Sequence, residues 1–184
     1  MYLNPISPYA VARVSQEMLS QCYINSYKLD IILTRSFNHT GPRQHDIFVI
    51  PSFIKQILEK TKTGNINEIT LFTGDVLIVR DFLDVRDVVR AYYLLLEKGI
   101  SGELYNVCSG VIRSIKDIIN ILSDLLSVHI NIEVDKDKIR PGDNKVIIGD
   151  NSKITELTGW TPQISIYDSL SDIITYWKSE LKLL

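Results

Sequence analysis

The segment Leu29-Asp30-Ile31-Ile32-Leu33-Thr34-Arg35-Ser36-Phe37 carries three aliphatic side chains in succession. A continuous apolar run of this kind between turn signals is typical of a strand covered on both faces, as in a parallel sheet. The next residues, Asn38-His39-Thr40-Gly41-Pro42, have the composition of a loop. We therefore predict a buried parallel strand over residues 29–37 and, with it, an α/β protein.

Helical and strand patterns alternate on both sides of this segment. Ser7 as N-cap and Pro8 at the first helical position predict a helix over residues 8–27. Its candidates for an apolar face are Val11, Val14, Met18, Leu19 and Cys22. Further helices are expected over residues 48–60, 85–98, 114–126, 152–157 and 167–181, and strands over 68–72, 79–83, 104–108 and 128–134. Few of these strands read as fully buried, so the first helix and strand look like the end of a larger sheet whose beginning is absent.

Composition bounds the function classes. The chain has 184 residues, of which 45% are hydrophobic, enough for a real core. A formal charge of −2 argues against a nucleic-acid or membrane-surface binder. No apolar run reaches the roughly 18 residues that span a bilayer, the first residues do not resemble a signal peptide, and two cysteines make no disulfide framework. We expect a cytoplasmic protein without nucleic-acid or membrane partners.

Tyr9 and Arg13 stand four residues apart, hence on one face of the first predicted helix. A fixed cation beside a phenol favours its anionic form, so such a pair can serve acid–base chemistry. Taken alone, a tyrosine with a cation at this spacing is more often a solvated helix face.

Ordered motifs along the chain resemble a known family. They are Asn4-Pro5-Ile6-Ser7-Pro8-Tyr9-Ala10-Val11-Ala12-Arg13, Thr34-Arg35-Ser36-Phe37-Asn38-His39-Thr40-Gly41-Pro42, Arg80-Asp81-Phe82-Leu83-Asp84-Val85-Arg86-Asp87, Tyr105-Asn106-Val107-Cys108-Ser109-Gly110, Arg140-Pro141-Gly142-Asp143 and Gly159-Trp160-Thr161-Pro162. In this order they resemble extended short-chain dehydrogenases/reductases acting on nucleotide sugars, and most closely the GDP-sugar branch of GDP-4-keto-6-deoxymannose reductases and GDP-mannose 4,6-dehydratases.

The resemblance implies a fold. The chain would be the C-terminal part of a Rossmann-type, NAD(P)-binding fold with a mixed α/β substrate-binding domain, and the N-terminal βαβ half would be absent. Residues 1–47 would hold the active-site helix and the following strand. Residues 48–184 would form mainly the nucleotide-sugar domain.

It also implies roles for residues of the catalytic and cofactor site. Tyr9 would protonate the sugar oxyanion as hydride arrives. Arg13 stands where the family has the lysine that binds the nicotinamide ribose; arginine keeps the charge but presents a planar fork instead of a compact ammonium. Tyr9, Arg13, Phe37 and His39 would contact the cofactor, although a histidine in a surface loop is an equally good reading of His39.

The substrate contacts implied by the resemblance are Asn38, Lys55, Arg80, Arg140 and Asp143. Guanidinium groups suit the diphosphate because they bind phosphate oxygens bidentately. Each position has a plainer alternative: a turn residue at Asn38, an exposed lysine at Lys55, a salt bridge from Arg80 to a nearby aspartate, and a solvated loop charge at Arg140. No metal site is predicted.

A glycine-rich dinucleotide-binding turn is missing from the sequence. We therefore expect NADP or NAD to serve the complete enzyme and this chain alone to bind neither. The expected partners are a GDP-hexose, the missing N-terminal half or a partner chain that supplies it, and a second copy in a homo-oligomer. The function implied is reduction of a GDP-4-keto-6-deoxy sugar with NADPH. The alternatives are a nucleotide-sugar dehydratase or epimerase, or a non-catalytic GDP-sugar-binding module.

Overall fold

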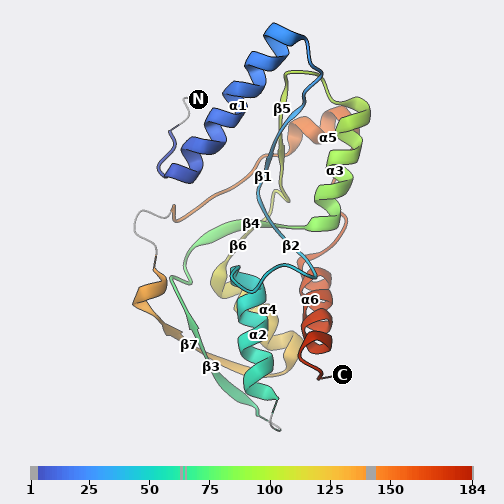
Figure 1. The fold of residues 1–184 in the computed structure, drawn as a ribbon. Helices are drawn as coiled ribbons and strands as arrows, with labels where there is room; N and C mark the ends of the chain where they lie inside the picture. The colour runs from blue at the N-terminus through green and yellow to red at the C-terminus, as the bar shows by residue number, and fades with distance from the viewer. Residues whose placement is uncertain (1–3, 63, 65, 140–143, 184) are drawn as a thin grey trace.

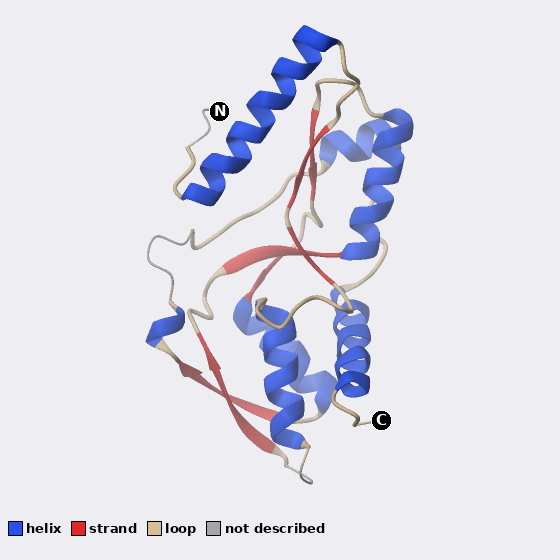
Figure 2. Cartoon of the chain, in the orientation of Figure 1, coloured by secondary structure: helices blue, strands red, loops and turns tan. Residues whose placement is uncertain are grey.

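Helices and strands alternate through the computed structural model, which describes residues 4–62, 64, 66–139 and 144–183 (Figures 1 and 2). This confirms the predicted α/β class. The helices are α1 (Pro8–Tyr27), α2 (Val49–Thr61), α3 (Val85–Lys98), α4 (Ile115–Leu126), the 3-10 turn η1 (Lys136–Lys138), α5 (Ser152–Thr158) and α6 (Ile166–Glu180). The strands are β1 (Leu33–Ser36), β2 (Asn38–Thr40), β3 (Glu68–Thr73), β4 (Val79–Asp84), β5 (Leu104–Val107), β6 (Ile112–Ser114) and β7 (His129–Val134).

Within the described ranges, the strands form three small sheets. β1 pairs in parallel with β5, from Leu33 opposite Leu104 to Ser36 opposite Val107. β4 lies between β2, to which it is parallel, and β6, to which it is antiparallel. β3 and β7 pair in parallel along their full length. The middle sheet joins the upper and lower parts of the molecule in Figure 1.

The predicted strand over residues 29–37 is parallel, as expected, but shorter and less buried than expected. The regular strand begins at Leu33, and Ile31, Ile32 and Leu33 are only half-buried. β1 has β5 as its neighbour on one edge, and no other described strand pairs with it. The apolar side chains are therefore half-covered because no described strand extends the sheet past β1.

The predicted loop after this strand is wrong in part, because Asn38–Thr40 forms β2. Its backbone pairs with β4, with Asn38 opposite Phe82 and Thr40 opposite Asp84. The polar composition of this segment predicted a loop, but the segment forms a strand because it pairs with β4, not because its residues have a high strand propensity. Thr40 is buried, whereas Asn38 and His39 remain exposed.

The larger core fills the lower part of the molecule. Helices α2, α4 and α6 cover it together with β3, β7 and part of β4. Four apolar side chains of α2 are buried there: Phe53, Ile54, Ile57 and Leu58. Each such side chain contributes on the order of 1.5–3 kcal/mol by leaving water. A capping box begins α4, in which Ser114 and Asp117 exchange hydrogen bonds.

A smaller core holds the upper part, between β5, α3 and α5. Trp160 is fully buried at its centre and donates from Nε1 to the carbonyl of Asp87 at 3.1 Å. Trp160 therefore anchors this core, whereas the Tyr167 side chain is 50% exposed. The start of α6 turns that side chain outward.

Helix α1 lies apart from both cores, at the upper left of Figure 1. Ser7 caps it as predicted, accepting from the amide of Ala10, yet none of its residues is buried. Most of the expected apolar face is exposed, including Met18 at 65%. Polar contacts attach the helix to the rest: Arg35 of β1 binds both carboxylate oxygens of Glu17, at 2.8 and 2.7 Å.

The composition of the two cores can be compared with the predicted domain boundary at residue 47. α3, β5 and α5 pack with Ile32 in the smaller core, although all three follow residue 47 in sequence. The boundary at residue 47 stays a prediction. The packing indicates that these three elements would join residues 1–47 in the same domain.

Candidate functional site

Tyr9 and Arg13 contact each other in the first turns of α1. Arg13 Nε donates to the Tyr9 hydroxyl at 3.1 Å, and its guanidinium carbon lies 5.2 Å from the centre of the tyrosine ring. Arg13 Nη1 also donates to Gln16 at 3.0 Å. Tyr9 is 69% exposed, so its hydroxyl is open to a reactant. The pair has the geometry for a proton donor held by a cation, and the same geometry also suits a solvated helix face.

The next predicted site residues lie where β1 passes into β2. The amide of Phe37 donates to the carbonyl oxygen of Val107 in β5 at 2.9 Å, and this hydrogen bond holds the residue between β1 and β2 in place. His39 Nδ1 lies 3.1 Å from the carbonyl oxygen of Phe37, so its ring folds back along the chain. Asn38 and His39 are exposed at the carboxyl end of β1, the edge at which open α/β sheets bind ligands.

Arg80 is largely buried in β4. Its Nη1 donates to the carbonyl of Val79 at 2.9 Å and to that of Asn144 at 2.7 Å. Because Asn38 lies opposite Phe82, Arg80 sits two residues from the position that faces Asn38. The β2–β4 pairing thus brings two predicted substrate contacts onto neighbouring strands.

The acidic residues beside Arg80 bind other partners. Asp81 is fully buried and accepts from the amides of Ser109 and Gly110 and from the Ser109 hydroxyl, all within 2.8 Å. It therefore fixes the turn after β5. Burial raises the pKa of the Cys108 thiol, and the nearby negative charge of Asp81 raises it further, to about 12. Cys108 is therefore protonated at neutral pH.

Lys55 forms an ion pair instead of pointing free into solvent. Its Nζ lies 2.6 Å from Asp46 Oδ2 and 5.6 Å from the centre of the Trp177 ring. The Asp46 carboxylate raises the pKa of Lys55 by hydrogen bonding. Nucleotide contact by Lys55 stays a prediction, and it would compete with this pair. Arg140 and Asp143 lie outside the described residues.

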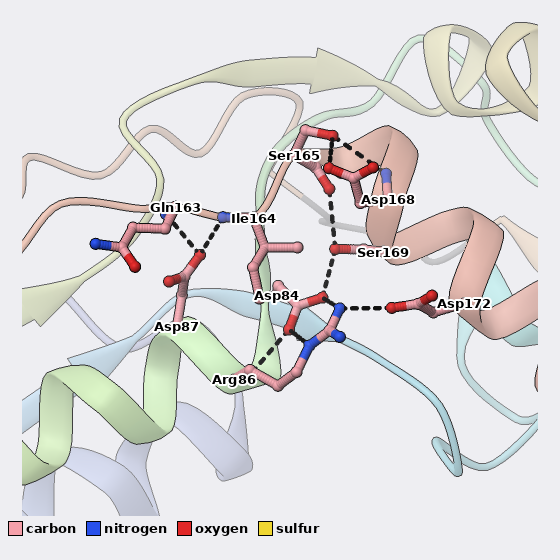
Figure 3. A network of polar contacts seen from close by, with 9 residues as sticks. All are labelled: Asp84, Arg86, Asp87, Gln163, Ile164, Ser165, Asp168, Ser169 and Asp172. Atoms are coloured by element: carbon pink, nitrogen blue, oxygen red, sulfur yellow. Dashed lines mark hydrogen bonds and ion pairs between the residues drawn. The ribbon is translucent and has the colours of Figure 1, made fainter.

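Sequence reasoning missed two features near these residues. Arg113 of β6 lies directly opposite Arg80 in the antiparallel pair, so two cations share one face of the sheet. Asp84 forms a polar network with Arg86 and α6 (Figure 3). The signal for the second was present, since the segment Arg80–Asp87 contains two arginines and three aspartates.

A small hollow of about 150 Å³ opens beside β4 and β6, lined among others by Phe82, Ser109, Arg113 and Tyr167. A larger one of about 390 Å³ lies at the far ends of α2 and α4, next to Leu58 and Leu126, away from every predicted site residue. Among the residues that the structure describes, no cluster of three or more His, Cys, Asp or Glu could hold a metal. None of the described helices is both long and apolar enough to cross a membrane.

This arrangement, a Tyr–cation pair on the helix before a parallel strand and polar residues at that strand's carboxyl end, is the arrangement of the extended short-chain dehydrogenase/reductase fold. The family described as GDP-mannose 4,6 dehydratase matches residues 1–173, so the chain belongs to that family.

Individual relatives agree with this assignment. The chain is 36% identical to GDP-6-deoxy-D-mannose reductase of Pseudomonas aeruginosa over 179 residues, 97% of this chain and 58% of the reductase. It is 30% identical to human dTDP-D-glucose 4,6-dehydratase over 180 residues, 95% of this chain and 49% of that enzyme.

Solved structures share the fold. RMD from Pseudomonas aeruginosa complexed with NADPH superposes with a TM-score of 0.87 at 35% identity, over 97% of this chain and 59% of that one. UDP-glucuronic acid 4-epimerase from Bacillus cereus, in complex with UDP-glucuronic acid and NAD, superposes with a TM-score of 0.86 at 31% identity. The superposition covers 98% of this chain and 55% of the epimerase chain. The chain thus spans about half the length of these relatives and corresponds to the C-terminal half of the reductase. The expected C-terminal part of a Rossmann-type fold is confirmed.

Proposed function

We propose that this chain is the nucleotide-sugar-binding part of an NADPH-dependent reductase of GDP-4-keto-6-deoxy-D-mannose. The observation that carries the proposal is the β2–β4 register, which sets Asn38 opposite Phe82 and thereby close to Arg80. The similarity to a GDP-6-deoxy-D-mannose reductase supports the choice of sugar.

Arginine side chains would hold the diphosphate. Arg80 lies against Asn144, and Arg140 precedes Asn144 by four positions in sequence. Two guanidinium groups can each form charge-assisted, bidentate hydrogen bonds to phosphate oxygens. Asn38, exposed at the end of β1, would add an amide donor toward the sugar or diphosphate. Lys55 and Asp143 complete the proposed substrate contacts.

Tyr9 and Arg13 would act at the reacting carbonyl. NADPH would supply hydride to the carbonyl carbon of the keto sugar. The Tyr9 hydroxyl would give its proton to the carbonyl oxygen, leaving an alcohol and a phenolate that regains a proton from solvent. Arg13, within hydrogen-bonding distance of that hydroxyl, stabilises the phenolate and offers its remaining donors to the ribose. Phe37 and His39 would border the nicotinamide.

A further polypeptide would complete the dinucleotide site, since no glycine-rich turn occurs in this sequence. Helix α3 presents an exposed apolar stripe at Val89, Tyr93 and Leu96, spaced to share one side of the helix. Next to the stripe, the Tyr92 hydroxyl lies 2.5 Å from the Ser36 hydroxyl of β1, and the second edge of β1 pairs with no described strand. An N-terminal α/β half would extend the sheet there and cover both surfaces.

Arg13 favours a second candidate, a GDP-sugar-binding module without hydride transfer. Its planar guanidinium is not equivalent to a lysine ammonium at a ribose. Dehydratase or epimerase activity is the remaining alternative, in keeping with the other relatives. A cytoplasmic location and a homo-oligomer remain predictions.

A fusion protein separates these candidates. The N-terminal part of the Pseudomonas reductase, which this chain does not span, is joined ahead of this chain, and NADPH oxidation is followed with GDP-4-keto-6-deoxy-D-mannose. Stoichiometric formation of GDP-6-deoxyhexose supports the reductase. Conversion of GDP-mannose to the keto sugar contradicts it in favour of a dehydratase. A fusion that binds NADPH and GDP-mannose by calorimetry but turns over neither sugar contradicts it in favour of the binding module.

A further inference from the structure

Asp84 occupies the junction between β4 and α3, where it is the last residue of the strand and the N-cap of the helix. Its side chain is fully buried. Oδ1 accepts from the amide and the Nε of Arg86, both at 2.8 Å, and Oδ2 accepts from Nη2 of Arg86 at 2.8 Å. The carboxylate is therefore oriented by a fork of fixed geometry.

The same carboxylate reaches helix α6. The hydroxyl of Ser169, itself fully buried, donates to Asp84 Oδ2 at 2.5 Å, and Arg86 pairs with Asp172 at 2.8 Å (Figure 3). α3 packs in the smaller core and α6 in the larger one. We call Asp84, Arg86, Ser169 and Asp172 the Asp84 network; it joins the two cores by polar contacts.

This junction is also a neighbour of the proposed ligand strand. Thr40 of β2 lies opposite Asp84, two residues after Asn38. Thr40 is buried and donates to Gln44 at 2.7 Å, and Gln44 donates to the carbonyl of His39 at 3.0 Å. β2 has only three residues, so its placement depends on where the end of β4 is held.

We propose that the Asp84 network is a positioning device: by fixing the end of β4 against α6, it sets the placement of β2 and hence of Asn38 relative to Arg80. The role of Asn38 and Arg80 in ligand binding rests on the proposed function, whereas the effect of the network on the placement of β2 does not. Asp84, Ser169 and Arg86 touch no substrate in this account. They act through the strand that carries Asn38.

Two variants of the 184-residue chain test the device. Ser169→Ala removes the hydroxyl that links Asp84 to α6, while Ile173→Val trims a fully buried side chain on the same helix without touching the network. The two are compared at temperatures equally far below their own melting points. This comparison removes the part of any effect that comes from stability alone.

Amide hydrogen exchange at Asn38–Thr40 is the first readout and calorimetric binding of GDP-mannose the second. We expect Ser169→Ala to speed exchange at these amides and to weaken binding by about fivefold, the effect of one hydrogen bond of roughly 1 kcal/mol, while Ile173→Val changes neither. Equal exchange in the two variants overturns the proposal and leaves the network a source of stability only. A wild type that binds no GDP-mannose contradicts the proposed function, and the exchange comparison still decides on the network.

Discussion

Arg13 Nε and the Tyr9 hydroxyl lie 3.1 Å apart on the exposed side of α1, with no other element of the described chain burying either side chain. The contact forms within one helix turn, so it needs no ligand and no second domain. What the pair lacks in this chain is an enclosure that excludes water and holds a reactant against it.

Loss of the Tyr9 hydroxyl should abolish turnover without loss of stability. In the fusion with the N-terminal part of the Pseudomonas reductase, we expect Tyr9→Phe to lower kcat roughly 10²–10⁴-fold, the usual contribution of a general acid. Because Tyr9 is mostly exposed, the melting temperature should stay within about one degree. Arg13→Lys serves as the companion variant and should retain activity. Unchanged kcat in Tyr9→Phe would remove this residue from the mechanism.

The isolated chain should bind no dinucleotide. It contains no glycine-rich turn to receive a pyrophosphate, and Tyr9 and Arg13 alone offer too few contacts. Titration of NADPH fluorescence with the purified chain should show no saturable change up to millimolar concentration. Saturable binding at micromolar concentration would contradict the assignment of the cofactor site to another half.

Self-association is expected of the chain by itself. Exposed apolar residues line α1 and α3, and an apolar area of about 400 Å² corresponds to on the order of 10 kcal/mol before association costs. Light scattering at low micromolar concentration should report a dimer or larger. Met18→Glu with Leu96→Glu should shift it toward monomer, and Asp124→Asn, a change at an exposed carboxylate on α4, should not. A monodisperse wild-type monomer would show that these surfaces need no partner.

The sequence was sufficient where local rules governed the outcome. The cap at Ser7 and the helix that Pro8 begins follow from side-chain chemistry within a few residues, and both are present. The apolar run at Ile31 also predicted parallel pairing correctly.

Long-range pairing decided what the sequence did not reveal. β2 forms because β4 offers backbone partners, and β6 places Arg113 opposite Arg80; neither follows from local composition. Burial of the first strand was overestimated because, among the described strands, β1 pairs only with β5, which leaves its other edge uncovered. For the site, the motifs indicated Asn38 and Arg80, but their proximity depends on the β2–β4 register.

Asp84 should make stability depend on pH in the acid range. Burial alone would raise the pKa of Asp84, but hydrogen bonds from Arg86 and Ser169 outweigh it and lower the pKa. A group whose pKa is lower in the folded state than in the unfolded state stabilises the fold at pH values above its unfolded-state pKa, which is near 4 for aspartate. This stabilisation is lost as the pH falls through the folded-state pKa.

Asp84→Asn tests this sign. We expect the free energy of unfolding of the variant to be about 1–3 kcal/mol lower than that of wild type at pH 7. This difference should narrow when urea unfolding is repeated below about pH 4. Asp150→Asn, at an exposed carboxylate bonded to Ser152, provides the matched control with a small effect. A wild-type advantage that is constant from pH 7 to pH 3 would show that Asp84 acts without its charge.

Calorimetric titration of GDP-mannose into the 184-residue chain tests the central claim most directly, because it requires only this chain. Two arginine–diphosphate contacts, each worth about 1.5–3 kcal/mol, predict a dissociation constant between about 40 μM and 6 mM. We expect Arg80→Ala with Arg140→Ala to abolish the heat, and Lys62→Ala, which removes an exposed charge at the far end of α2, to leave it unchanged. Equal heats from wild type and both variants, or none from wild type, would contradict the account.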